Sequence, residues 1–160
     1  MAKPTQTAVA EEAHAPGTLS LGMLPDLLGF QLRMAQLATF RDFLETFADL
    51  GLTPTLFGAL VLVEANPGAK QSELARTLGL DRSTMVSIID RLEREGWVRR
   101  RRAATDRRSN AIELTAAGRR ILPEFKRRVA EHEARLTAHL GADEQARLRD
   151  LLGRIFPDRR

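Results

Sequence analysis

The stretch that decides the fold is Asp81–Thr115, which reads DRSTMVSIIDRLEREGWVRRRRAATDRRSNAIELT. Asp81 is a good helix N-cap, because its carboxylate can accept hydrogen bonds from the free amides of a first helical turn. The apolar residues that follow recur at i, i+3, i+4 and i+7, which predicts one apolar face along a helix. They are Met85, Ile88, Ile89 and Leu92. Gly96 ends this predicted helix, because glycine adopts the left-handed conformation at a helix end without strain.

The other side of this helix and the segment after it are polar. The side chains that fall on that side can form hydrogen bonds: Ser83, Thr84, Ser87 and Arg91. Two strand-like segments follow, Trp97–Arg101 and Ala111–Leu114, joined by a loop that contains Asp106, Arg107 and Arg108. A helix with a hydrogen-bonding face, followed by a β-hairpin tipped with arginines, is suited to reading DNA in two grooves. The structural alternative is an ordinary amphipathic helix and a hairpin whose charges are simply solvated.

Positive charge is concentrated in the same stretch. Between Arg82 and Arg108 there are nine arginines and four acidic residues. These 27 residues therefore carry a net charge of +5, so the rest of the chain, whose total is +4, carries −1. A basic focus on a nearly neutral body predicts a localised contact with a polyanion.

Several of these segments resemble the MarR family of winged helix-turn-helix transcriptional regulators. The wing signature of that family is similar to Asp106-x-Arg108 followed by Leu114-Thr115-x-x-Gly118, and its reading head is similar to Gln71–Ala75, Ser83–Thr84, Asp90–Glu93 and Gly96–Val98. The resemblance extends from about Leu24 to Phe156. It implies a homodimer on a pseudo-palindromic operator in double-stranded DNA. It also implies that Arg108 reaches the minor groove, that Arg107 meets the DNA backbone and that Asp106 orients the wing by ion pairing.

Helix starts supply further candidates for DNA contact. Free amides and the helix dipole favour anions at the first turn of a helix, and helices are predicted to begin near Thr53 and Gln71. Thr53, Gln71 and Ser72 are therefore predicted to contact DNA phosphates, although plain capping explains each of them equally well. Arg82 and Arg101 are predicted to join the same contact.

The segments that flank this head are predicted to form long helices. From about Leu24 to Leu50 the pattern is apolar on more than one side of a helix. Thr115 is expected to cap a helix that runs to about Leu140 and is bent or weakened at Pro123. A last helix, Ala142–Phe156, is expected to turn its apolar side inward: Leu148, Leu151, Leu152 and Ile155. Because these helices have more apolar surface than one small head can cover, we expect a symmetric homodimer.

The predicted fold is mainly α. It combines a winged helix-turn-helix, which is an α/β head with a two-stranded wing, with long N- and C-terminal dimerisation helices. Residues 1–20 have no hydrophobic period and are expected to form a flexible tail. Residues 53–115 are expected to form the DNA-binding region, and residues 21–52 and 116–160 the helical dimerisation region.

An effector site is expected near the first helix. Arg33 lies among Phe30, Met34 and Leu37, which places an arginine in apolar surroundings. Relatives in the family that the chain resembles often bind aromatic carboxylates or their coenzyme A thioesters between the dimerisation helices and the head. Arg33, with Arg41 as a second candidate, is therefore predicted to meet a carboxylate or phosphate. A snorkelling side chain or a structural ion pair is the alternative.

No catalytic or metal chemistry is expected. The sequence has no glycine-rich phosphate loop and no nucleophile with a histidine nearby, so the chain is predicted not to be an enzyme and to need no cofactor. His132 and His139 would lie roughly 10 Å apart along a helix, too far to share one ion, so no metal site is predicted. Asp42, Glu45 and Asp49 are interpreted as a solvated helix face.

Composition bounds the location of the protein. The chain has no cysteine, which fits a reducing compartment and excludes thiol oxidation as a sensing chemistry. Its longest apolar run, Leu56–Val63, is too short to span a membrane, and the N-terminus lacks the apolar core of a signal peptide. We expect a cytoplasmic protein without membrane contact.

The sequence therefore predicts a ligand-responsive transcriptional regulator. The expected activity is repression of a nearby operon, released by a small, anionic, partly aromatic effector such as an aromatic acid or its coenzyme A thioester. The alternative is a ligand-independent architectural DNA-binding protein that uses the same heads. The two differ in whether any ligand weakens binding to specific DNA.

Overall fold

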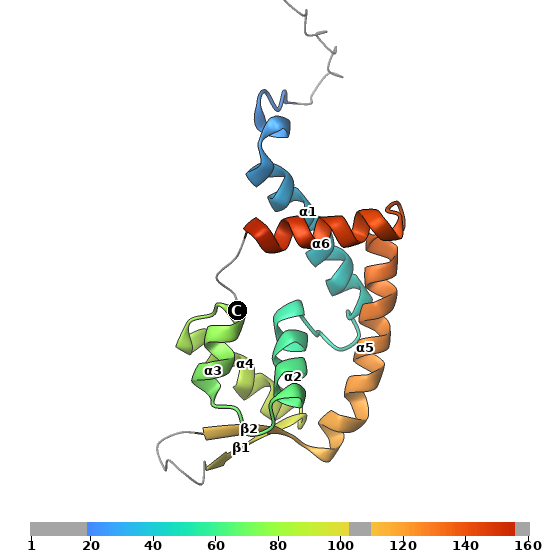
Figure 1. The fold of residues 1–160 in the computed structure, drawn as a ribbon. Helices are drawn as coiled ribbons and strands as arrows, with labels where there is room; N and C mark the ends of the chain where they lie inside the picture. The colour runs from blue at the N-terminus through green and yellow to red at the C-terminus, as the bar shows by residue number, and fades with distance from the viewer. Residues whose placement is uncertain (1–18, 103–109, 156–160) are drawn as a thin grey trace, which may run out of the picture. The chain divides into compact units, whose positions relative to one another are not determined.

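The computed structural model describes residues 19–102 and 110–155. These residues form six α-helices, one short 3-10 helix and one two-stranded antiparallel sheet (Figure 1). The mainly α fold with a two-stranded wing is confirmed. In chain order the elements are η1 Leu24–Asp26, α1 Leu28–Thr46, α2 Pro54–Ala65, α3 Gln71–Leu78, α4 Arg82–Arg94, β1 Val98–Arg102, β2 Asn110–Leu114, α5 Ala116–Leu136 and α6 Ala142–Ile155. The chain divides into two compact units, residues 1–37 and residues 38–160.

Helices α3 and α4 form the predicted helix-turn-helix. Helix α3 ends at Gly79, which has a left-handed φ of 65°, and Asp81 caps α4 by accepting a hydrogen bond from the backbone N–H of Thr84 at 2.8 Å. Gly96 follows α4 with a φ of 72°, so the predicted glycine at the helix end is confirmed. The buried residues of α4 are the four of the predicted apolar face: Met85, Ile88, Ile89 and Leu92.

The hairpin continues directly from α4. Strand β1 pairs with β2 in an antiparallel register that sets Val98 opposite Leu114 and Arg100 opposite Ile112. Val98, Leu114 and Ile112 are buried in the core. Because side chains alternate along a strand, Arg99 and Arg101 lie on the other face of β1 from Val98 and Arg100.

The core of the larger unit joins the head to α5. Phe47 and Phe125 are fully buried, with ring centroids 6.0 Å apart in an edge-on arrangement. The Trp97 ring, next to the hairpin, lies 5.0 Å from that of Phe125. This aromatic cluster fixes the start of the wing against α5.

The ends of two long helices differ from prediction. Helix α5 ends at Leu136 rather than near Leu140, because the next residue, Thr137, leaves helical geometry and its hydroxyl donates a hydrogen bond to the Glu133 carbonyl at 2.8 Å. Helix α5 continues through Pro123. The predicted first helix is divided into η1 and α1 and stops at Thr46.

The interpretation of Asp42, Glu45 and Asp49 as a solvated helix face was wrong for Asp42, which is half-buried against α5, while Asp49 is exposed beyond the end of α1. The Asp42 carboxylate lies 2.5 Å from Nδ1 of His132, which is 1% exposed, and accepts a hydrogen bond from Arg135 at 3.1 Å. Asp49 accepts a hydrogen bond from Arg128 at 2.9 Å. The hydrogen bond with His132 is the main cause that lowers the pKa of Asp42. Together with the bond from Arg135 it outweighs partial desolvation, which would raise that pKa. These contacts bind the second half of α1 and the residues that follow it to α5.

The apolar sides of α1 and α6 are exposed within the single chain. The expected inward orientation of the α6 residues is wrong for the protomer, since α6 contains no buried residue. Large exposed side chains remain on both helices: Phe40, Leu44, Leu148, Leu151 and Ile155. Large apolar side chains left exposed on a helix are available for an interaction site, so the predicted dimerisation role of these helices stays a prediction.

Candidate nucleic-acid interface

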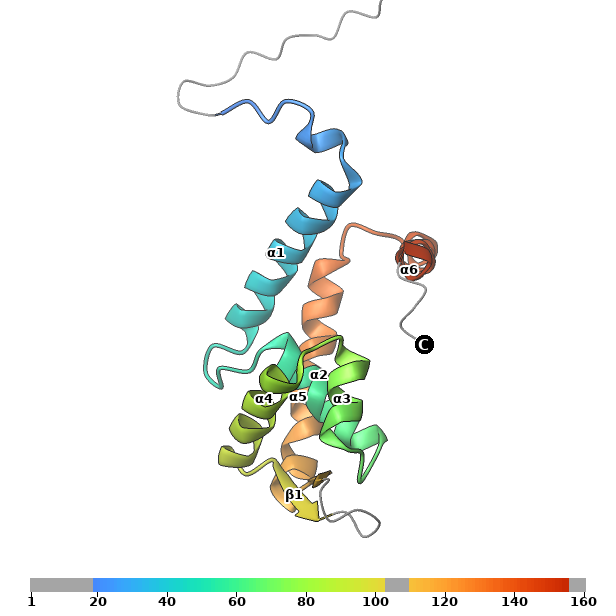
Figure 2. The same ribbon diagram turned by 90° about the vertical axis from the view of Figure 1, so that its left-hand side faces the viewer.

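Helix α4 has one face buried in the core and one face exposed. Figure 2 shows it leading into β1, so that the helix and the wing lie at the same end of the head. Its apolar face is buried, while four of the predicted DNA-contacting residues are exposed: Arg82, Ser83, Thr84 and Ser87. The structure thus brings these four together on one helix.

The hydroxyl groups on this face already donate their protons. Ser83 and Thr84 donate to the two carboxylate oxygens of Asp81 at 2.5 and 2.6 Å. Ser87 donates to the Ser83 carbonyl at 3.2 Å. A hydroxyl has one donor and two acceptor lone pairs, so in this arrangement each oxygen is left as an acceptor. The bonds from Ser83 and then Thr84 also hold the pKa of Asp81 far below its usual range.

Arg91 is held against the loop between α1 and α2. Its Nη2 donates a hydrogen bond to the Gly51 carbonyl at 2.7 Å. Gly51 has a left-handed φ of 57°, and a Cβ built on it would lie 2.9 Å from that same Nη2. The guanidinium has five N–H donors, so this bond leaves others for a second partner. The sequence predicted Arg91 on the DNA-facing side and gave no sign of this contact.

The three predicted phosphate contacts lie at helix starts, as expected. Thr53 is the N-cap of α2, and its hydroxyl accepts a hydrogen bond from the backbone N–H of Leu56 at 3.3 Å. Gln71 and Ser72 begin α3, where the Glu73 carboxylate accepts the backbone N–H of Lys70 at 2.8 Å. Capping therefore accounts for Thr53, while Ser72 is exposed at the first turn.

Three arginines of β1 pair with acidic residues on opposite faces of the strand. On one face of the strand, Arg99 and Arg101 contact the Glu113 carboxylate at 3.0 and 3.5 Å. On the other face, the Arg100 guanidinium contacts Glu93 at 2.6 Å and Asp90 at 2.5 Å. The hydrogen bond from Arg99 is the main cause that lowers the pKa of Glu113. Glu113, which lies outside the counted stretch, therefore neutralises part of the basic focus, whereas Asp90 and Glu93 are already subtracted in its net charge of +5.

Sequence reasoning did not predict that Arg100 pairs with Asp90 and Glu93. Two signals could have indicated this pairing. Asp90 and Glu93 are three residues apart and so share one side of a helix, and Arg100 shares its strand face with buried Val98. The remaining predicted wing residues, Asp106, Arg107 and Arg108, lie outside the described residues.

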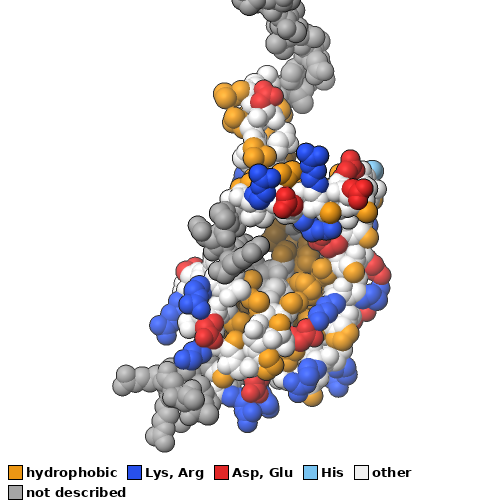
Figure 3. Space-filling view, in the orientation of Figure 1, with side chains coloured by type: hydrophobic (Ala, Val, Ile, Leu, Met, Phe, Trp, Pro, Cys, Tyr) orange, Lys and Arg blue, Asp and Glu red, His pale blue; other side chains and the backbone are white. Residues whose placement is uncertain are grey.

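A hollow lies on the side of the larger unit away from the wing. Figure 3 shows hydrophobic side chains lining it beneath α6, between α2 and α5. The predicted effector-binding arginines, Arg33 and Arg41, are both exposed on α1. Arg41 belongs to the larger unit and Arg33 to the smaller one.

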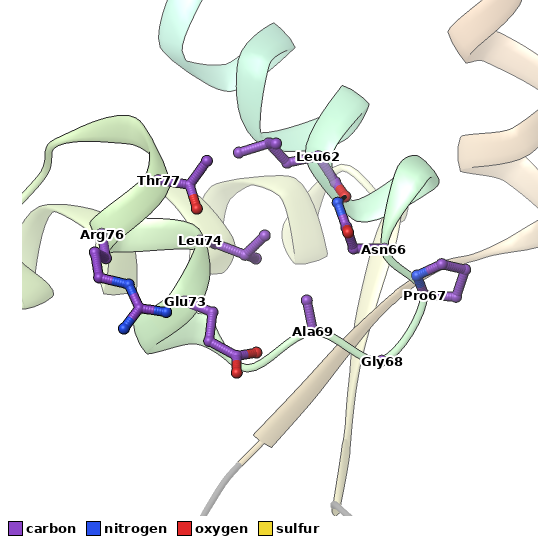
Figure 4. Close-up of a pocket in the computed structure, with 9 residues that line it drawn as sticks. All are labelled: Leu62, Asn66, Pro67, Gly68, Ala69, Glu73, Leu74, Arg76 and Thr77. Atoms are coloured by element: carbon purple, nitrogen blue, oxygen red, sulfur yellow. Dashed lines mark hydrogen bonds between the residues drawn. The ribbon is translucent and has the colours of Figure 1, made fainter. Parts of the chain in front are cut away.

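A second depression lies between the end of α2 and α3. Figure 4 shows Asn66, Glu73, Arg76 and Thr77 around it, with Leu74 at its base. None of the residues predicted to bind DNA or an effector lines it.

Residues 19–102 and 110–155 contain neither a candidate metal site nor a helix that could span a membrane. There, no group of three or more His, Cys, Asp or Glu side chains could hold a metal ion. His132 is turned to Asp42, and His139 lies beyond the end of α5. No helix in the described part of the chain is both long and apolar enough to cross a membrane.

Comparison with known proteins identifies the family. The MarR family model matches residues 52–109. The putative transcriptional regulatory protein for the hcr operon of Thauera aromatica is 34% identical over 155 residues, which cover 96% of this chain and 89% of that protein. The transcriptional repressor CouR bound to a 23-mer DNA duplex is 45% identical with a TM-score of 0.82, and the match covers 86% of this chain and 98% of the CouR chain. CouR bound to p-coumaroyl-CoA is 41% identical with a TM-score of 0.81, and the match covers 88% of this chain and 99% of the CouR chain. This chain therefore belongs to the MarR family of winged helix-turn-helix proteins, and it is a transcriptional regulator rather than an enzyme.

Proposed function

We propose that the protein is a homodimeric repressor that binds a pseudo-palindromic operator and releases it when an aromatic acid or its coenzyme A thioester binds. One observation carries the DNA-binding part of this proposal. Helix α4 is anchored by a buried apolar face, exposes a polar face, and leads within four residues into a two-stranded wing. A helix for the major groove beside a hairpin for the minor groove is a recurring way to dock on DNA.

The hydrogen bonding of α4 favours particular base edges. Ser83, Thr84 and Ser87 are left as acceptors, since their protons go to Asp81 or to a backbone carbonyl. In the major groove the exposed donors are the amino groups of adenine and cytosine. The three hydroxyls would therefore accept from those groups, while Arg82 supplies a cation at the helix start.

Phosphate contacts would come from the flanking elements. Thr53, Gln71 and Ser72 offer helix starts, which favour anions through free amides and the helix dipole. Arg101 is exposed on the outer face of β1. Its Nη1 lies 3.5 Å from the carboxylate of Glu113, which Arg99 also contacts. Arg91 would reach DNA with N–H groups other than the one that binds Gly51. Arg107 and Arg108 would extend the contact to the minor groove.

The relatives support the effector class. CouR binds p-coumaroyl-CoA, which combines an aromatic acyl group with a polyanionic carrier. A hollow lined by hydrophobic side chains suits the acyl group. Arg41 in the larger unit and Arg33 in the smaller unit are each exposed, and each separately offers a partner for a carboxylate or phosphate. The effector would act by population shift, because it prefers a spacing of the two heads that does not match consecutive major grooves.

The dimer is the remaining part of the proposal. A pseudo-palindromic operator matches the two-fold symmetry of a homodimer. The exposed apolar sides of α1 and α6 offer surface for it. We place the protein in the cytoplasm, where its DNA would be.

The experiment is a gel shift on the DNA immediately upstream of the protein's own coding sequence, with a random duplex of equal length as the control. Effector arms contain p-coumaroyl-CoA, p-coumarate or coenzyme A alone. The proposal expects specific binding that p-coumaroyl-CoA or p-coumarate weakens and coenzyme A alone does not. Equal binding to both duplexes, insensitive to the two aromatic compounds, would instead support the architectural alternative.

A further inference from the structure

We propose that Arg100 is a positioning residue for DNA binding: it clamps β1 to the last two turns of α4 and so sets the wing at a fixed angle to the reading helix. This inference rests on the proposed function, since it assigns a task to the wing in DNA binding. The three partners, Arg100, Asp90 and Glu93, are here called the helix–wing clamp.

The clamp joins the two elements through three contacts. The Arg100 guanidinium donates through Nη1 to Oε2 of Glu93 at 2.6 Å and through Nη2 to Oδ1 of Asp90 at 2.5 Å. The backbone N–H of Arg100 donates to Oε1 of Glu93 at 3.0 Å. Glu93 therefore binds both the side chain and the main chain of the same strand residue, which restricts how β1 can move on α4.

The arginine of the clamp is more sheltered than its neighbours on β1. The Arg100 side chain is 23% exposed, whereas Arg99 and Arg101 are 53% and 60% exposed. Two charge-assisted bonds from one planar, partly buried guanidinium hold that guanidinium in a defined geometry. Partial burial alone would lower the pKa of Arg100, but bonding to Asp90 and Glu93 outweighs it and raises that pKa.

Both terminal nitrogens of Arg100 are engaged, so this arginine is poorly placed to bind a phosphate directly. Its partners are also acids on the helix that is proposed to face DNA. An acid near DNA repels phosphates, and removing it normally strengthens binding through electrostatics. A clamp predicts the opposite sign, because loss of Glu93 would release the wing.

This difference in sign is the basis of the test. The key variant is Glu93→Ala, and the matched control is Glu95→Ala. Glu95 is exposed at the end of the same helix, so the control makes the same change of charge outside the clamp. Arg100→Ala and the Arg100→Ala/Glu93→Ala double variant complete a double-mutant cycle. Binding of the full chain to a random-sequence duplex and to DNA upstream of its own coding sequence is followed by fluorescence anisotropy over a series of salt concentrations.

The clamp predicts that Glu93→Ala binds both duplexes on the order of tenfold more weakly than wild type, as loss of wing phosphate contacts requires. Glu95→Ala should bind as well as wild type or better. The salt dependence should also become shallower in Glu93→Ala, by about 0.9 in the slope of log K against log salt for each phosphate contact that the wing loses. The double variant should bind no more weakly than Arg100→Ala alone.

The clamp is wrong if Glu93→Ala binds as tightly as Glu95→Ala, or if it keeps the full salt slope. Failure of wild type to bind either duplex would overturn the proposed function instead, so the two failures are distinct. Circular dichroism first checks that each variant is folded. If Glu93→Ala does not fold, Asp90→Ala takes its place, because Asp90 is 50% exposed and contacts only the guanidinium. The comparison of Asp90→Ala with Glu95→Ala then decides whether the clamp positions the wing.

Discussion

A Cβ atom on Gly118 would collide with the backbone carbonyl of Trp97. The first turn of α5 therefore packs directly on the residue that opens the wing, and only glycine permits this approach. Thr115 strengthens the same junction, because its hydroxyl donates a hydrogen bond to the Gly96 carbonyl at 2.6 Å and accepts the N–H of Gly118 at 3.0 Å.

Gly118→Ala should destabilise the fold by about 1–3 kcal/mol, the range for overpacking a well-packed site. Gly153→Ala is the matched control, since a Cβ there meets nothing within 4 Å. In the last turn of α6 that change should stabilise by up to about 1 kcal/mol. Urea unfolding followed by circular dichroism measures both. Equal stability of the two variants would show that the junction can relax and that the contact is not tight.

The buried His132 needs its carboxylate partner. Asp42→Ala leaves a side chain that is 1% exposed without its 2.5 Å contact, which should cost about 1–3 kcal/mol. Glu45→Ala removes an exposed acid from the same helix and serves as the control. Thermal unfolding of the two variants at pH 7 gives the comparison. If Asp42→Ala is as stable as Glu45→Ala, the contact between Asp42 and His132 does not stabilise the fold.

The same pair has a defined pH dependence. Because the pKa of Asp42 is lower in the folded state than its ordinary value of 3.8, the stabilisation is fully present above about pH 5. It is lost as the pH falls through the folded-state pKa. The difference in stability between wild type and Asp42→Ala should therefore shrink on acidification below about pH 4. Unfolding titrations at a series of pH values test this, and a constant difference down to pH 2 would contradict it.

Dimerisation should depend on the exposed side of α6. Leu151 is 42% exposed in the single chain, and an aspartate there would place an unpaired charge in the expected interface. Leu151→Asp should therefore dissociate the dimer, while Arg149→Asp, on the same helix, tests whether negative charge alone is responsible. Sedimentation equilibrium measures the oligomeric state of both variants and of wild type. If wild type is a stable folded monomer at micromolar concentration, the proposed architecture fails.

The sequence predicted the elements whose signals are local. The cap at Asp81, the apolar repeat from Met85 to Leu92 and the glycine at 96 are signals that extend over at most two turns of helix, so α4 could be located closely. The strand-like segments predicted the wing, the excess apolar surface predicted the dimer, and the family resemblance implied the same architecture.

Contacts between distant segments could not be predicted in the same way. Asp42 and His132 are 90 residues apart in the sequence, and neither has a local pattern that points to the other. The bond from Arg91 to Gly51 depends on how the loop between α1 and α2 passes α4. The charge count subtracted Asp90 and Glu93 but could not show that both of them pair with Arg100.

The central claim is that α4 reads bases while the wing binds the DNA backbone and minor groove. A salt titration by fluorescence anisotropy, on DNA upstream of the protein's own coding sequence and on a random duplex, tests it most directly. The variants are Ser87→Ala and Arg107→Ala/Arg108→Ala. Ser87→Ala should reduce the preference for the upstream DNA by roughly 1 kcal/mol and keep the salt slope. The wing double variant should weaken binding to both duplexes and reduce the slope by about 0.9 per lost phosphate contact. A wing variant that keeps its full slope, or a Ser87→Ala variant with unchanged preference, would contradict this division of roles.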